Sequence, residues 1–208
     1  MTILLSDPRV AAVPVLENGE QLVRLPRSFG PARALVRTGL AVRLTLARAD
    51  LPGGYDLRVV EGHRSALDQQ AIVTRYTAEV RAAHPHATGV EVDRLTSRFV
   101  SPVAVAPHVA GAAVDLTLVD GRGRALDLGT PIDATPEESE GRCFFDAADI
   151  SPEARHHRTV LSRALRTAGL VNYPTEWWHW SYGDRYWALS TGATAALYGP
   201  VELARAAA

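Results

Sequence analysis

Residues 107–120 read PHVAGAAVDLTLVD, and this stretch indicates a buried strand that carries reactive side chains. The run AAVDLTLV is apolar and β-rich, as is typical of a strand in a sheet. A Gly-rich turn and a short second strand are expected to follow, up to residue 129. Asp115 interrupts the apolar run, and a buried carboxylate must be paired, hydrogen-bonded or metal-bound. His108 precedes it by seven positions.

Helices and strands are expected on the amino-terminal side of this stretch without a regular order. Residues 32–48 predict a helix that ends at LPGG, and YDLRVVEG predicts a strand that ends near Glu61. Ser65 is a typical N-cap for a helix over residues 66–83 with one apolar stripe. Residues 1–31 carry short apolar stretches between Pro and Gly, which suits irregular chain and edge strands that wrap a core.

The carboxyl-terminal side continues the same irregular mixture. Residues 134–153 are acidic and turn-rich, which indicates a surface excursion, and residues 154–168 predict an amphipathic helix that Gly169 stops. A Trp-rich stretch then suggests a final strand pair. Because no regular βαβ alternation is present, the pattern favours an α+β fold over a doubly wound parallel sheet.

Bulk composition limits the class of protein. A chain of 208 residues with 47% hydrophobic and 22% charged residues fits a single globular domain, residues 1–208. The net charge of −1 indicates neither nucleic acid nor an anionic membrane as a partner. Cys143 is the single cysteine, so no internal disulfide forms. The apolar run in the opening MTILLSDPRV is too short for a signal peptide, so we expect a cytoplasmic location. The oligomeric state is not readable from the sequence.

The stretch 174–187, PTEWWHWSYGDRYW, gathers tryptophans around Glu176 and His179. One interpretation is hydrophobic core, and the other is an apolar wall that excludes water from a reactive pair. Both hold together if alternate members of the cluster face the core and the site.

A zinc site is one interpretation of His108, Asp115 and His179. Two imidazoles and one carboxylate are a common protein ligand set for a catalytic zinc ion, one per chain, with a water in the fourth position. The other interpretation of Asp115 is a carboxylate anchored by an arginine, and the spacing from His108 alone leaves both open. The other histidines include His84, His86, His156 and His157, which we expect to be solvated surface imidazoles.

Glu176 and Arg64 complete a hydrolytic set in the zinc interpretation. Glu176 precedes His179 by three residues and is the natural general base for a bound water. Residues i and i+3 of a regular strand point to opposite faces, so this pair requires a bulge or a helical turn. Arg64 follows the predicted strand YDLRVVEG and is the candidate that stabilises the negative oxygen of a tetrahedral intermediate. The alternative interpretation is that Arg64 is an ordinary surface charge.

The sequence resembles the D-alanyl-D-alanine dipeptidases in four motifs and their order, namely EGHRS, PHVAGAAVDLTL, DLGTPID and NYPTEWWHWSYGDRYWA. These dipeptidases are zinc enzymes of the vancomycin-resistance type, within the D,D-peptidase/hedgehog-fold metallopeptidases, and the resemblance spans nearly the whole chain. It implies a mostly antiparallel sheet with flanking helices, and hydrolysis of the D-Ala–D-Ala peptide bond in peptidoglycan metabolism. It also implies zinc ligation by His108, Asp115 and His179, a general base at Glu176 and a transition-state arginine at Arg64. The carboxylate for the substrate ammonium group falls on Asp133.

The sequence departs from the family pattern near the substrate. His63 and Ser65 flank Arg64 where the family has Tyr and Pro, and Ala106 stands where it has Ser. The loss of a hydroxyl donor at Ala106 can shift the preferred dipeptide. We expect His63 to replace the Tyr in packing.

Two alternatives to the dipeptidase therefore stay open. One is a zinc D,D-carboxypeptidase or endopeptidase that acts on peptidoglycan peptides. The other, from a different class, is a zinc-stabilised binding module without catalysis. Glu176 beside an open three-ligand site favours an enzyme over the binding module.

Overall fold

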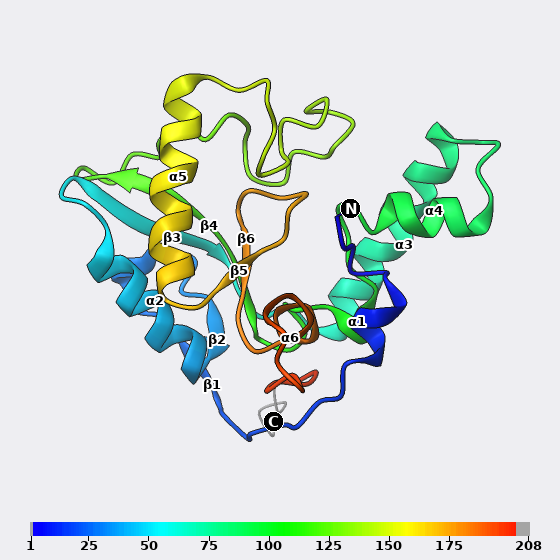
Figure 1. Ribbon diagram of the computed structural model, residues 1–208, viewed down its shortest axis with the longest axis horizontal. Helices are drawn as coiled ribbons and strands as arrows, with labels where there is room; N and C mark the ends of the chain where they lie inside the picture. The colour runs from blue at the N-terminus through cyan, green and yellow to red at the C-terminus, as the bar shows by residue number, and fades with distance from the viewer. Residues whose placement is uncertain (1, 203–208) are drawn as a thin grey trace, which may run out of the picture.

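The computed structural model describes residues 2–202, and its centre is a four-stranded antiparallel sheet in the order β3-β4-β6-β5 (Figure 1). The strands are β3 (Tyr55–Glu61), β4 (Ala113–Asp120), β5 (Val171–Asn172) and β6 (His179–Ser181). β4 pairs with β3 on one side and with β6 on the other. The predicted strand, the α+β class and the antiparallel sheet with flanking helices are confirmed.

Alternation along β4 separates the core from the site. Successive side chains of a strand point to opposite faces. Leu116 and Leu118 are fully buried in the main apolar cluster, which also contains residues from α2 (Thr38–Asp50) and α5 (Pro152–Thr167). These helices cover that face of the sheet, at the left of Figure 1. Asp115 therefore points to the opposite face.

Two helix predictions are confirmed by their caps. In α3 (Ala66–Ala83), the Ser65 hydroxyl accepts a hydrogen bond from the backbone N–H of Asp68 at 3.1 Å. α5 begins at Pro152, and Gly169 follows it with a φ of 85°. A left-handed residue after the last helical turn is the usual reason for such an end, because glycine adopts this conformation without strain.

Two sequence predictions were wrong in detail. The predicted helix over residues 32–48 begins only at Thr38, because β2 (Leu35–Arg37) pairs with β1 (Leu22–Arg24) in a separate two-stranded sheet. The short second strand after β4 is reduced to one bridge between Val119 and Ala125. In both places contacts distant in sequence override the local pattern.

The remaining helices lie mainly on the other side of the molecule. These are α1 (Pro8–Ala12), α4 (Gly89–Thr96), α6 (Arg185–Thr191) and the short 3₁₀ helices η1 (Arg27–Phe29) and η2 (Val103–Val105). α4 packs against α3 and α1 packs against α6 (Figure 1). None of the helices in the described residues has the length and apolarity needed to cross a bilayer.

Residues 134–151 contain neither helix nor strand. This segment still buries Ser139 and Cys143. Arg158 of α5 holds it with charge-assisted hydrogen bonds to the carbonyl oxygens of Arg142, Phe144 and Phe145, at 2.6–3.0 Å. The segment is thus attached to the sheet layer through α5.

Candidate active site

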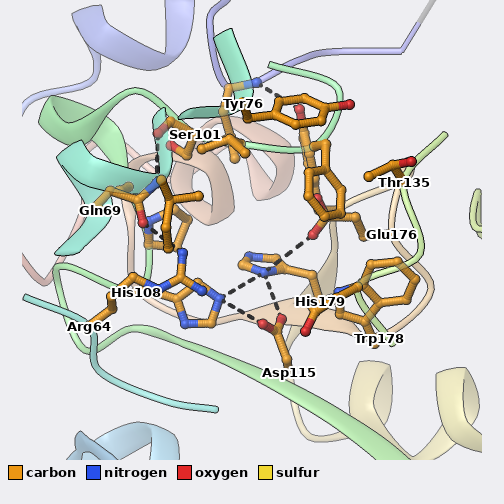
Figure 2. A pocket seen from close by; sticks show the side chains of 18 of the residues that line it. Arg64, Gln69, Tyr76, Ser101, His108, Asp115, Thr135, Glu176, Trp178 and His179 are labelled. Atoms are coloured by element: carbon orange, nitrogen blue, oxygen red, sulfur yellow. Dashed lines mark hydrogen bonds and ion pairs between the residues drawn. The ribbon is translucent and has the colours of Figure 1, made fainter. Parts of the chain in front are cut away.

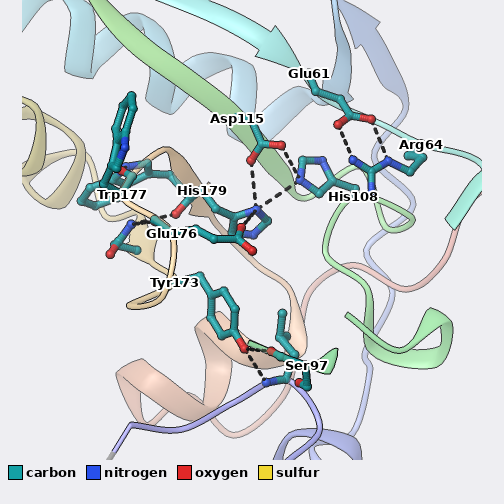
Figure 3. Close-up of polar contacts among 12 residues, drawn as sticks. Glu61, Arg64, Ser97, His108, Asp115, Tyr173, Glu176, Trp177 and His179 are labelled. Atoms are coloured by element: carbon teal, nitrogen blue, oxygen red, sulfur yellow. Dashed lines mark hydrogen bonds and ion pairs between the residues drawn. The ribbon is translucent and has the colours of Figure 1, made fainter. Parts of the chain in front are cut away.

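His108, Asp115 and His179 converge on one point of the structure. Nε2 of His108 lies 3.1 Å from Nδ1 of His179, and these two nitrogens lie 3.3 and 3.1 Å from the carboxylate oxygens of Asp115. All three side chains are buried. Figure 3 shows the three side chains pointing toward one another. The three residues that the sequence singled out therefore form one cluster.

Strand register brings two of the three together. Asp115 of β4 and His179 of β6 are directly opposed partners in the antiparallel ladder. Directly opposed residues place their side chains on the same face of a sheet, a few ångströms apart. The sheet itself thus sets the distance between carboxylate and imidazole.

His108 reaches the cluster from a tight turn that follows η2. Its Nδ1–H donates a hydrogen bond to the carbonyl oxygen of Gly62 at 2.7 Å. Because a carbonyl only accepts, this bond fixes the tautomer and leaves the Nε2 lone pair directed at the cluster.

Arg37 anchors the same turn from behind. Its buried guanidinium donates a hydrogen bond to the carbonyl oxygen of Ala110 at 2.9 Å. Its backbone N–H donates to the carbonyl oxygen of Gly111 at 2.8 Å. It also donates to Glu17 at 3.1 Å and to the carbonyl oxygen of Gly199 at 3.1 Å. One arginine thus joins residues from both ends of the described chain to the His108 turn.

The carboxylate and the two imidazoles of the cluster interact electrostatically with one another. Burial acts to raise the pKa of Asp115, but the imidazoles of His108 and His179 hold this pKa below its usual range. In turn, Asp115 raises the pKa of His108 against the effect of burial. None of the arginines in the described residues forms an ion pair with Asp115, so the anchored-carboxylate interpretation is not supported.

The donor set fits a zinc ion. Two imidazole nitrogens and a carboxylate oxygen are ligands that zinc prefers, and three protein ligands leave a position for water. Ligand atoms about 2 Å from one tetrahedral ion lie roughly 3.3 Å from each other, close to the separations seen between these atoms. The hydrogen bond from His108 to Gly62 is the usual orienting contact of a metal-bound histidine.

Glu176 lies beside this cluster on a turn. Its carboxylate oxygen is 3.8 Å from Nδ1 of His179. The backbone N–H of Glu176 donates to the Tyr173 carbonyl at 3.0 Å, and that of His179 donates to the Glu176 carbonyl at 3.4 Å. The predicted turn between the two residues is therefore present. Burial, followed by the nearby carboxylates of Asp115 and Asp133, raises the pKa of Glu176 well above its usual range.

Arg64 lines the same cavity, just past the end of β3. Glu61 and Gln69 hold its guanidinium, and the sequence had suggested a role for neither (Figure 3 shows the Glu61 contacts). Nε of Arg64 donates to Glu61 at 2.7 Å, Nη2 donates to the second Glu61 oxygen, and Nη1 donates to Gln69 at 2.9 Å. A guanidinium has five N–H groups, so two stay available for a ligand in the cavity.

Gln69 is itself fixed. It is buried in the first turns of α3, and its amide N–H donates to the Ser101 carbonyl at 2.8 Å. Gln69 lies four residues after the Ser65 cap, which puts it on the helix face above Arg64. This spacing from the cap is the sequence feature that could have predicted its contact with Arg64.

Asp133, the last residue of the sequence DLGTPID, lies in the cavity wall. Its φ of 63° is in the left-handed region, which is uncommon for a residue other than glycine and often marks a functional position. Burial, with the carboxylates of Asp115 and Glu61, raises the pKa of Asp133 to about 6. The structure thus places all six predicted site residues around one cavity.

The tryptophan cluster divides between core and site. Trp177 and Trp180 belong to the main core, where the Trp177 indole N–H donates to the Thr130 hydroxyl at 2.8 Å. Trp178 belongs to the same core, and it also lines the cavity (Figure 2). Both interpretations of the cluster therefore hold.

Tyr173 joins the amino-terminal segment to the site. Its hydroxyl accepts a hydrogen bond from the backbone N–H of Leu5 at 3.1 Å and donates to the Ser97 carbonyl. Its ring packs edge-on against His179, with ring centres 6.1 Å apart. Leu5 and Tyr173 both line the cavity, so residues near the start of the chain form part of its wall.

The other histidines have structural surroundings. His84, His86 and His156 are exposed, as predicted. His157 was predicted to be solvated, but it is buried, and Nδ1 donates to the Asp127 carbonyl at 2.7 Å. The ring of His63 is hydrogen-bonded to the Val201 carbonyl at 2.8 Å, which ties the carboxyl-terminal residues to the end of β3.

Comparison with known proteins agrees with this site. The Peptidase_M15 family profile, described as "D-ala-D-ala dipeptidase", matches residues 32–192. A D-alanyl-D-alanine dipeptidase of Synechocystis is 29% identical over 185 residues, which cover 76% of this chain and 73% of that protein. A D-alanyl-D-alanine dipeptidase of Escherichia coli K12 is 35% identical over 72 residues, 35% of each chain.

Solved structures were also compared. VanYB in complex with D-alanine-D-alanine has a TM-score of 0.48 at 18% identity, over 89% of this chain and 94% of that chain. The LdcB LD-carboxypeptidase has a TM-score of 0.47 at 18% identity, over 86% of this chain and 77% of that chain. The profile match covers more than half of the sequence, including every predicted site residue, and the chain belongs to the Peptidase_M15 family of D-Ala-D-Ala dipeptidases.

Proposed function

We propose that the six residues around the cavity carry out the reaction of this family, zinc-dependent hydrolysis of the peptide bond of D-alanyl-D-alanine. The observation that carries the proposal is the convergence of three zinc-type ligand atoms within 3.3 Å, with a buried carboxylate 3.8 Å from one of them. The dipeptide is the small-molecule partner. The Synechocystis relative, named for this activity, supports the substrate class.

His108, Asp115 and His179 would hold the zinc ion, one per chain. Zinc supplies a Lewis acid and lowers the pKa of a bound water to about 7. The two imidazoles present unprotonated nitrogens to the ion, and the carboxylate offsets part of its charge. The Gly62 carbonyl keeps His108 in the tautomer that this requires.

Glu176 would act as general base and then as general acid. Its carboxylate accepts the proton of the attacking water and delivers it to the nitrogen that leaves as the new amino group. The raised pKa supports both steps, because a carboxyl group with a pKa nearer neutrality takes and returns a proton more evenly. Its burial next to Trp178 keeps bulk water from competing.

Arg64 would stabilise the negative oxygen that develops on the attacked carbonyl. Its two unused N–H groups are donors fixed in advance by Glu61 and Gln69, so no reorganisation is needed during the reaction. Asp133 would bind the free ammonium group of the dipeptide, and its position in the wall of the cavity supports this role.

Ala106 supports a shift in dipeptide preference. The side chain is buried and lines the cavity, so no hydroxyl is available there to a substrate carboxylate or amide. A site without this donor discriminates less strongly against substrates that do not use it.

The test is steady-state hydrolysis of a panel of D,D-, L,D- and L,L-dipeptides by the zinc-loaded protein, with a D-Ala–D-Ala-terminated pentapeptide alongside. We expect the D,D-dipeptides to be the best substrates and chelation to stop turnover. Comparable hydrolysis of the pentapeptide would instead favour a peptidoglycan carboxypeptidase. Activity that survives chelation would contradict the zinc assignment.

We also propose a cytoplasmic location and, where glycopeptide antibiotics select for it, a role in vancomycin resistance through removal of D-Ala–D-Ala before it enters the cell wall. Free dipeptide is a precursor made inside the cell, which supports this location. Cell fractionation and growth on vancomycin with and without the gene test the two statements.

A further inference from the structure

The cavity extends well beyond the metal-ligand cluster. It has a volume of about 380 Å³ and continues from the cluster to the side of α3. Figure 2 shows Asp115 and His108 at one end, and Tyr76 and Thr135 toward the other. We call the part lined by Tyr76, Thr135 and Glu138 the outer end of the cavity.

Two separate walls meet at the outer end. Tyr76 belongs to α3, whereas Thr135 and Glu138 belong to the segment that follows Asp133. The Tyr76 hydroxyl donates a hydrogen bond to the carboxylate of Glu137 at 3.0 Å, although the residues are 61 positions apart. This contact joins the two walls directly beside the cavity.

Arg98 strengthens the same joint. Its Nη1 donates to the other oxygen of Glu137 at 3.4 Å, and its guanidinium lies 5.4 Å from the centre of the Phe144 ring. Arg98 follows α4, so both α3 and the residues after α4 hold one carboxylate of the segment. The polar contacts of Tyr76 and Arg98 with the segment therefore both end on the carboxylate of Glu137.

The two halves of the joint differ in rigidity. Tyr76 is only 6% exposed and packs with Val80, Val92 and Val100 in one apolar cluster, with its ring centre 5.0 Å from that of Phe99. A ring packed in this way keeps its rotamer. Glu137 has 45% of its side chain exposed, so its position depends on the two contacts described above.

The joint lies close in sequence to the residue that would bind the substrate ammonium group, since Glu137 follows Asp133 by four positions. A free dipeptide bound through Asp133 ends at its ammonium group. A peptide extended at its amino end has no ammonium group there, and its next residue must pass the segment that carries Thr135, Glu137 and Glu138. Closure of the outer end therefore affects extended peptides and leaves room for the dipeptide.

We propose that Tyr76 and Glu137, braced by Arg98, are specificity-determining residues that close the outer end of the cavity to peptides extended at the amino end. The inference rests on the proposed function, since it places the substrate ammonium group at Asp133. It assigns the length limit to a hydrogen bond between two walls, and it gives none of the three residues a part in bond cleavage.

The experiment compares D-Ala–D-Ala with glycyl-D-Ala–D-Ala, which adds the smallest residue at the amino end. The readout is the ratio of kcat/KM for the tripeptide to kcat/KM for the dipeptide, in the zinc-loaded wild type and in Tyr76→Ala, Glu137→Ala and Tyr76→Phe. We expect this ratio to rise at least about tenfold in Tyr76→Ala and Glu137→Ala, through faster hydrolysis of the tripeptide. Tyr76→Phe keeps the ring and loses the hydrogen bond, so its ratio should lie in between.

Glu140→Ala is the matched control. It removes an exposed carboxylate from the same segment, whose ion pair is with Arg142 at 3.3 Å and does not reach α3. Its ratio should equal that of the wild type. N-acetyl-D-Ala–D-Ala, which removes the ammonium charge with a smaller extension, separates charge recognition from length.

Folding and zinc content of each variant are checked by thermal melting and metal analysis. If Tyr76→Ala does not fold, Glu137→Ala carries the test, because its side chain is exposed. A wild type that hydrolyses D-Ala–D-Ala, with a ratio unchanged in folded Glu137→Ala and Tyr76→Phe, overturns the length assignment alone. A wild type that cleaves both peptides equally well also overturns it. A wild type inactive on D-Ala–D-Ala overturns the proposed function and this inference with it.

Discussion

The metal-ligand cluster and the wall that faces it are built in different ways. Asp115 and His179 sit on paired strands, so backbone hydrogen bonds and strand register set their separation. The facing wall consists of α3 and the segment from Asp133 to Phe145, which meet through the side chains of Tyr76, Arg98 and Glu137. A sheet holds reacting atoms to within fractions of an ångström, whereas side-chain contacts between separate segments can change without loss of the fold. The separation of Asp115 and His179 thus depends on the sheet, whereas the enclosure of the cavity depends on the wall.

Removal of a metal-ligating side chain should give the largest effect, because it disrupts the cluster that the sheet holds together. We expect Asp115→Asn to lose stoichiometric zinc and measurable turnover, since an amide offsets no cationic charge. Asp120→Asn makes the same substitution at the other end of β4, where the Asp120 carboxylate accepts hydrogen bonds from the backbone of a turn. This variant should keep both zinc and turnover. Metal analysis with kinetics decides; full zinc occupancy in Asp115→Asn would contradict the ligand assignment.

Glu176→Gln should give the next largest effect and leave the metal in place. Loss of a general base costs about 10²–10⁴-fold in kcat. The substitution keeps size and removes only the ability to accept a proton, so zinc content should equal that of the wild type. Glu153→Gln, an exposed position in the first turn of α5, is the control. An unchanged kcat in Glu176→Gln would remove Glu176 from the mechanism.

Loss of a contact to Arg64 should have a smaller effect, because the guanidinium stays present but less well placed. Glu61→Gln removes the charge that binds two of its nitrogens. We expect kcat to fall about tenfold with little change in KM, less than the 10²–10³-fold for removal of a whole transition-state donor. In an Arg64→Ala background, Glu61→Gln should have no further effect on kcat. An additional fall there would show that Glu61 acts independently of Arg64.

An effect of similar size should come from the facing wall, as a dependence of KM on pH. Asp133 has a pKa of about 6, so its carboxylate is ionised above this pH and protonated below it. Because only the ionised form attracts an ammonium group, KM for D-Ala–D-Ala should rise about tenfold from pH 7 to pH 5. Asp133→Asn should raise KM at pH 7 and remove this dependence. A KM that rises equally in the variant would place the titration elsewhere.

Local patterns were enough to predict several parts of the fold. The apolar run of β4, the strand that ends at Glu61, the Ser65 cap of α3 and the glycine that ends α5 are each contained in a few neighbouring residues. Their physical causes, namely side-chain periodicity, capping and left-handed backbone, act over one or two turns of chain. The same applies to the turn between Glu176 and His179, because residues three positions apart on a regular strand could not point into one site.

Other features depended on contacts between distant segments. Residues 35–37 form strand β2 because β1 lies beside them, and the buried His157 ring is satisfied because the backbone carbonyl of Asp127 accepts a hydrogen bond from its Nδ1–H. Gln69 lies only five positions from Arg64, but its amide is also fixed by a hydrogen bond to the carbonyl of Ser101, which is 32 positions away.

The sequence by itself determined which residue types meet at the site, because two histidines, an aspartate and a glutamate in a specific motif set suffice to indicate zinc hydrolysis. Tertiary structure alone decided how the cavity is enclosed. The joint between Tyr76 and Glu137 spans 61 residues, and its geometry follows from how α3 and the segment after Asp133 pack. Ligand chemistry is a property of side chains, whereas a wall is a property of distances between segments, and only the folded chain fixes those distances.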